Sequence, residues 1–81
     1  MVYAKIRITK HAMERMEKYG ISEALVIKTL KRPKVLIESY AGRKIAQRKL
    51  NSYVLRVVFE KKRNEIVVIT VYKARRERYE I

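Results

Sequence analysis

The spacing of hydrophobic residues changes at Pro33 in this chain of 81 residues. Before Pro33 they recur every three or four residues, as on one face of a helix. After Pro33 they alternate, as in a strand with one buried face. A chain with helices first and strands second is expected to form an α+β domain, with the helices packed on one face of the sheet. At this length we expect a single domain over residues 1–81.

The two predicted helices have sequence signals at their ends. Thr9 and Ser22 can each cap a helix N-terminus, and Gly20 stands where a left-handed residue commonly ends a helix. Pro33 ends the second helix, because the residue before a proline is disfavoured in the helical conformation. These signals predict a helical hairpin between Thr9 and Pro33.

Four strands joined by short connections are expected after the helices. The predicted strands are Val35 to Tyr40, Arg43 to Leu50, an alternating run from Tyr53 to Phe59, and Ile66 to Tyr72. The connections are Ala41-Gly42, Asn51-Ser52 and a charged loop from Lys61 to Asn64. Short connections favour antiparallel neighbours, so we predict a four-stranded antiparallel meander. The basic residues from about position 73 are expected to form a tail.

The composition excludes several kinds of site. Without cysteine the chain has no disulfide, thiolate zinc site or cysteine nucleophile, and its single histidine argues against a histidine metal cluster. We therefore expect no metal and no other cofactor. No apolar run approaches the ~18 residues of a membrane span, and the N-terminal sequence does not resemble an export signal. We expect a cytoplasmic protein without membrane contact, and the scarcity of Asn and Gln is typical of thermophile proteins.

The formal net charge of +13 favours a polyanionic partner, since an anion offsets the self-repulsion. Alternation along the strands divides the side chains between two faces. The residues predicted to face the helices in the last strand are Val67, Ile69 and Val71. The polar residues predicted on the opposite, uncovered face are Arg56, Thr70 and Tyr72, with Arg48 as a further candidate. The competing interpretation is that such residues simply suit a strand that faces water.

His11 and Arg15 form a second candidate group, because residues four apart share one face of a helix. His11 stands in the first turn, where backbone N–H groups and the helix dipole attract phosphate. The alternative is that both are ordinary solvated residues of a surface helix.

Several short motifs match a known family in order along the chain. They are the run from His11 to Met16 (His-Ala-Met-Glu-Arg-Met), Gly20-Ile21, Val26, Leu30, Pro33, Gly42-Arg43, Arg48, Leu55 to Val58, and Ile69 to Tyr72. From about Thr9 to Lys73 the chain resembles an uncharacterised family of small prokaryotic domains. That family is grouped with the RelE/ParE-like and BrnT-like toxins in the barnase, colicin and RelE nuclease assemblage. Relatives typically have arginine at the position of Tyr19.

The resemblance implies a RelE-like fold and metal-independent cleavage of RNA by attack of the 2′-hydroxyl on the phosphate. The positions that it carries over are His11, Arg15, Arg43, Arg48, Thr70 and Tyr72. His11 would act as general base or acid and Tyr72 as a weaker proton partner or a stacking platform for a base. Arg48 and Arg56 would clamp the phosphate, and Thr70 would position one of its oxygens.

Further basic residues and partners complete the hypothesis. Arg15 and Arg43 would hold flanking phosphates, and Arg75 and Arg76 would add general attraction to RNA. RNA, including mRNA on the ribosome, and an acidic antitoxin that folds on binding are the expected partners. Two alternatives stay open. The protein could bind nucleic acid without cleaving it, or it could be a toxin that acts on a protein target such as gyrase.

Overall fold

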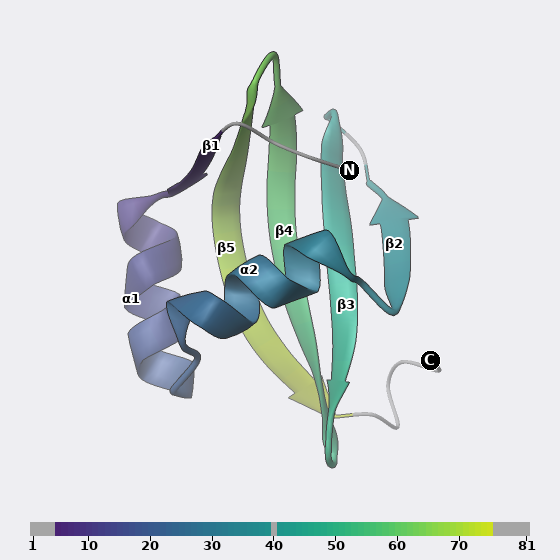
Figure 1. The fold of residues 1–81 in the computed structure, drawn as a ribbon. Helices are drawn as coiled ribbons and strands as arrows, with labels where there is room; N and C mark the ends of the chain where they lie inside the picture. Colours follow the sequence, from purple (N-terminus) through teal and green to yellow (C-terminus); the bar gives the residue numbers. More distant parts are fainter. Residues whose placement is uncertain (1–4, 40, 76–81) are drawn as a thin grey trace.

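The computed structural model describes residues 5–39 and 41–75 and forms an α+β fold. In chain order the elements are β1 (Lys5–Ile8), α1 (Lys10–Tyr19), α2 (Glu23–Lys31), β2 (Val35–Glu38), β3 (Arg43–Leu50), β4 (Tyr53–Lys62) and β5 (Glu65–Arg75). The strands build one five-stranded sheet in the order β1-β5-β4-β3-β2 (Figure 1). The predicted combination of two helices with a sheet is confirmed.

The sheet is mixed, so the prediction of a four-stranded antiparallel sheet is wrong. Strands β2 to β5 pair antiparallel with their neighbours, as expected from the short turns. The additional strand β1 pairs parallel with β5, with Ile6 beside Ile66 and Ile8 beside Val68. A strand of four residues gives only a weak alternating pattern. Its parallel pairing needs a long crossover, which all the intervening elements supply.

The predicted caps hold both helices. The Thr9 hydroxyl accepts a hydrogen bond from the Ala12 N–H at 3.2 Å, and the Ser22 hydroxyl accepts one from the Leu25 N–H at 3.1 Å. Gly20 ends α1 with a φ of 66°, a left-handed conformation that favours glycine. The short connection through Gly20 turns the chain, so that α2 runs across the strands while α1 lies beside β5 (Figure 1).

Both helices pack on the same face of the sheet and share one hydrophobic core. The buried members of this core are Ala12, Met16, Ile21, Val26, Leu30, Ala46, Leu55, Val57, Phe59, Ile66, Val68 and Val71. In β4 the alternating residues Leu55, Val57 and Phe59 therefore face the helices. Burial of these side chains on one face leaves the other face of the sheet without a helix among the described residues.

A β-bulge changes the predicted assignment of faces in β5. Val58 pairs with Thr70 but Phe59 pairs with Val68, so Ile69 is an extra residue in β5. The alternation therefore shifts at this point. Val71 faces the helices as predicted, whereas Val67 lies on the opposite face, and Ile66 and Val68 enter the core in its place.

The ends of three strands differ from the prediction. β2 ends at Glu38, whereas its predicted end is Tyr40, which lies outside the described residues. β4 extends through Lys61 and Lys62 into the predicted charged loop, and β5 begins one residue early, at Glu65, which leaves a tight turn at residues 63–64. β5 also continues to Arg75, so positions 73–75 belong to the sheet and not to a tail. Within the described residues neither helix is long and apolar enough to cross a membrane.

Candidate functional site

Thr9 joins the start of α1 to the bulge in β5. Its hydroxyl lies 2.9 Å from the carbonyl oxygen of Val68 and 3.2 Å from that of Ile69, and its N–H donates to the Val68 oxygen at 3.2 Å. The same hydroxyl oxygen caps α1 by accepting from Ala12. β1 ends at Ile8, which pairs with Val68 of β5. Beyond that pair the first turn of α1 lies beside β5 in place of β1.

This placement brings His11 to Thr70. His11 Nε2 and Thr70 Oγ1 are 3.1 Å apart, a hydrogen bond between residues 59 positions apart in the chain. Which group donates depends on the tautomer of the imidazole. His11 is exposed and Thr70 is half-buried, so the imidazole is fixed at one nitrogen while it remains open to solvent.

Arg56 and Tyr72 form the second contact of the site. They are paired across β4 and β5, and Arg56 Nη1 donates a hydrogen bond to the Tyr72 hydroxyl at 2.8 Å. The guanidinium carbon is 5.5 Å from the ring centre. A guanidinium directly above the ring centre at that distance could not reach the hydroxyl, so the hydrogen bond and not stacking defines the pair. Arg56 is only 9% exposed, which fixes its guanidinium in a largely desolvated position.

The strand register puts these two contacts on one face. Arg56 pairs with Tyr72 and Val58 with Thr70, so Arg56, Thr70 and Tyr72 share the face opposite the helices, as predicted. His11 reaches Thr70 from the β5 edge. We call His11, Arg56, Thr70 and Tyr72 the His11 cluster; it combines an imidazole, a phenol, a hydroxyl and a permanent cation.

Arg15 lies next to this cluster, one helical turn beyond His11. Four helical residues advance about 6 Å and two strand residues about 6.6 Å. Because α1 packs along β5, Arg15 is therefore level with Tyr72. Its side chain is partly exposed, in a position where a charged ligand can approach it.

Gln47 belongs to the same row of residues but was not predicted as a site residue. It pairs with Arg56 across β3 and β4, is only 2% exposed, and its Oε1 has no hydrogen-bond partner among the described residues. Because β3 has polar residues on both faces, composition gives Gln47 no distinguishing signal. The one available indication was that Gln47 and Arg48 are adjacent in the strand, so that their side chains lie on opposite faces of the sheet.

Arg48 is not part of the His11 cluster, and its predicted place on the uncovered face is wrong. It pairs with Leu55, which is in the core, so it lies on the helix side of the sheet. Its Nη1 donates to the carbonyl oxygen of Arg32 at 3.2 Å. Arg48 therefore cannot clamp one phosphate together with Arg56, because the sheet separates the two side chains.

The remaining predicted basic residues lie away from the cluster. Arg43 Nε is 3.4 Å from Glu60 Oε1, and Arg43 is four residues from Gln47 along β3, about 13 Å. Arg75 pairs with Tyr53 at the end of β5, with the parity of the helix-facing residues. Arg76 lies outside the described residues. In the described part of the chain no three His, Cys, Asp or Glu side chains gather into a group that could hold a metal ion.

These features define a class of protein: a small, strongly basic α+β domain with helices on one face of a mixed sheet and a polar cluster on the other. The chain belongs to the family described as Domain of unknown function (DUF4258), whose sequence profile matches residues 8–73. No curated protein and no solved structure matches the chain. The matched range contains every residue of the His11 cluster.

Proposed function

We propose that the protein binds RNA and cleaves its phosphodiester backbone without a metal ion. The observation that carries this proposal is the joining of His11, through Thr70, to the face that holds the Arg56–Tyr72 pair. A solvent-exposed acid–base group beside a desolvated cation is what cleavage by the neighbouring 2′-hydroxyl requires.

In the overall reaction one proton moves from the 2′-hydroxyl to the leaving 5′-oxygen. His11 takes the proton of the 2′-hydroxyl, whose oxygen forms a bond to phosphorus as the bond from phosphorus to the 5′-oxygen breaks. The products are a 2′,3′-cyclic phosphate and a 5′-hydroxyl, which receives the proton. This role of His11 requires the tautomer in which Nε2–H donates to Thr70 Oγ1, because Nδ1 is then the nitrogen that accepts the 2′-hydroxyl proton.

Arg56 and Tyr72 act on the opposite side of the phosphate. The guanidinium stabilises the charge that develops on the non-bridging oxygens, with charge-assisted hydrogen bonds. Tyr72, whose hydroxyl oxygen accepts a hydrogen bond from Arg56, is the weaker proton partner, which acts at the leaving 5′-oxygen. Arg15 attracts the next phosphate along the strand.

Charge and family resemblance support an RNA substrate. The formal net charge of +13 favours a polyanion, and the motif order resembles an uncharacterised family that is grouped with the RelE/ParE-like and BrnT-like toxins. As part of the same proposal we expect a cytoplasmic protein whose partner is an acidic antitoxin. The mRNA on a ribosome is one form that its substrate takes.

Incubation of the purified protein with end-labelled RNA in EDTA tests the proposal. We expect fragments with cyclic phosphate ends and no cleavage of the same sequence as DNA, which lacks the nucleophile. His11→Ala should lower the rate by roughly 10²–10⁴. Lys10→Ala, an exposed change in the same helical turn, is the matched control and should cleave like the wild type.

Other results would identify the alternatives. Binding with a steep salt dependence but no product, with or without ribosomes, would make the protein a non-catalytic nucleic-acid-binding domain. Loss of translation or of gyrase activity with intact RNA would point to a protein target. Cleavage that His11→Ala leaves unchanged would remove His11 from the mechanism.

A further inference from the structure

A hollow of about 310 Å³ lies where α2 ends against the last residues of β3. It is lined by Arg32, Pro33, Lys34, Arg48 and Lys49. Four of these five residues are cationic at neutral pH. We call this hollow the α2–β3 pocket.

The strand pairing explains why the hollow exists. β2 starts opposite Gln47, so Arg48 and Lys49 continue β3 without β2 beside them. The segment after α2 fills part of that space and is tied to β3 by two hydrogen bonds. Arg48 Nη1 donates to the Arg32 carbonyl at 3.2 Å, and the Lys34 N–H donates to the Gln47 carbonyl at 2.8 Å. The basic side chains therefore extend from a backbone whose position is fixed.

No ion pair among the described residues offsets the charge of the pocket. Among the described residues the ion pairs are made by Glu38, Glu60 and Glu65, and none of them includes a cation of the pocket. Four like charges around one hollow repel each other, and a bound anion relieves that repulsion. Arginine and lysine side chains together are well suited to phosphate oxygens.

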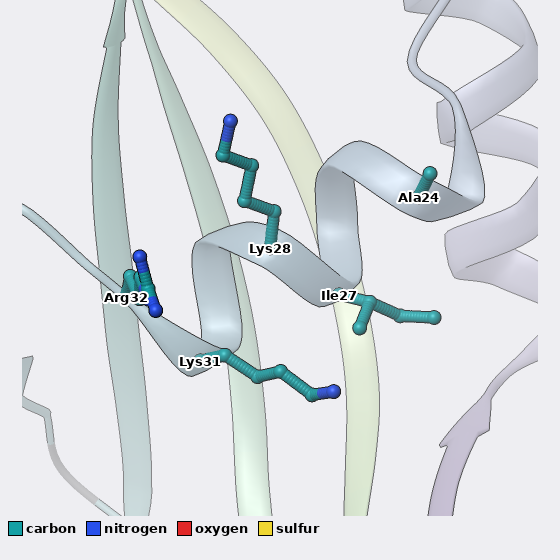
Figure 2. A pocket seen from close by; sticks show the side chains of 5 residues that line it. All are labelled: Ala24, Ile27, Lys28, Lys31 and Arg32. Atoms are coloured by element: carbon teal, nitrogen blue, oxygen red, sulfur yellow. The ribbon is translucent and has the colours of Figure 1, made fainter.

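The outer surface of α2 is also basic. A shallow hollow there is lined by Ala24, Ile27, Lys28, Lys31 and Arg32. Figure 2 shows that the side chains of Lys28 and Lys31 point in different directions from the helix, away from a common centre. Two cations that diverge offer separate, solvated charges. Lys28 and Lys31 therefore provide a control in which two lysine charges can be removed outside the pocket.

We propose that the α2–β3 pocket binds a backbone phosphate of the RNA strand whose scissile phosphate lies at the His11 cluster. This inference rests on the proposed function. Lys49 shares the face of Gln47, Arg56 and Tyr72, two residues further along the strands. Strand geometry puts Lys49 about 12 Å from Tyr72, a span that a few nucleotides cover. The pocket thus selects substrates that extend beyond the cleaved bond.

Binding of a fluorescent 2′-O-methyl RNA, which cannot be cleaved, tests the pocket separately from catalysis. Lys34→Gln with Lys49→Gln removes two pocket charges and keeps the Arg48 hydrogen bond to the backbone. For single strands each lost phosphate contact lowers the salt slope by ~0.7, which is about fivefold in affinity at 0.1 M salt. We expect that loss for an oligonucleotide long enough to span both regions and no loss for a dinucleotide.

The control is Lys28→Gln with Lys31→Gln, which removes the same charge from the outer surface of α2. It should change the affinity less than twofold. Equal losses of affinity in the two double variants would show a general charge effect and overturn the pocket. An unchanged affinity of the pocket variant would overturn it as well. Thermal unfolding of each variant verifies that it is folded.

The failure of this inference is distinguishable from the failure of the proposed function. Pocket-dependent binding without cleavage of natural RNA retains the pocket and rejects the nuclease. With cleavage present, the pocket variant should raise KM and leave kcat unchanged, whereas His11→Ala should lower kcat. A pocket variant that lowered kcat alone would contradict the assignment of the pocket to substrate binding.

Discussion

Replacing Thr9 by valine tests whether one hydroxyl holds the first turn of α1 at the bulge of β5. Valine keeps the branched shape of threonine and suits the extended backbone at this position, where φ is −67° and ψ is 160°. The substitution removes the acceptor for the Ala12 N–H and the donor to the β5 carbonyls, with little change in packing.

The expected cost follows from the two interactions lost. Loss of an N-cap costs about 0.5–2 kcal/mol, and loss of a neutral hydrogen bond about 0.5–1.5 kcal/mol. The Val68 carbonyl keeps the Thr9 N–H as a donor, whereas the Ile69 carbonyl loses its contact with the hydroxyl. We expect a destabilisation of about 1–3 kcal/mol. In a domain of this size 2 kcal/mol lowers Tm by roughly 8–16 °C.

Urea unfolding followed by circular dichroism measures this change. Thr9→Ser is the matched control, because serine keeps the hydroxyl and caps at least as well as threonine. It should stay within about 1 kcal/mol of the wild type, with the same denaturant slope. A valine variant as stable as the serine variant would refute the reasoning that the Thr9 hydroxyl joins α1 to β5.

Two further substitutions test the uncovered face of the sheet. Gln47→Leu removes a buried amide oxygen that has no hydrogen-bond partner among the described residues. Thermal unfolding should therefore show equal or higher stability, and a loss above about 1 kcal/mol would contradict this expectation. Tyr72→Phe removes one acceptor from the largely buried Arg56, so we expect a loss of about 1–2 kcal/mol in urea unfolding together with slower RNA cleavage. Slower cleavage at unchanged stability would mean that the 2.8 Å hydrogen bond contributes nothing to folding.

The helical hairpin was predictable because its signals are local. Thr9, Gly20 and Ser22 act within one turn of their own position, and all three have the predicted role. The bounds of β3 were also predicted, since turns flank it on both sides. Local backbone chemistry is sufficient for such features.

Features that depend on distant partners were not predictable in the same way. The alternation in β5 is interrupted at Ile69, where the carbonyls that Thr9 contacts lie, and no residue near Ile69 in sequence signals this. Arg48 stands in a strand with polar residues on both faces, so parity could not decide its side. The placement of Arg56, Thr70 and Tyr72 on one face was predictable because all three lie on the same side of the bulge.

The position of β5 in the sheet determines when this protein can acquire its site. β5 is the last strand in sequence but lies between β1 and β4, so without it the sheet is divided into two parts. Contacts between such distant segments form late, because closing long loops costs entropy before the contacts stabilise the chain. A nascent chain that has exposed α1 but not β5 has no Thr70 to bind His11. The cluster can therefore assemble only after the segment through β5 has left the ribosome.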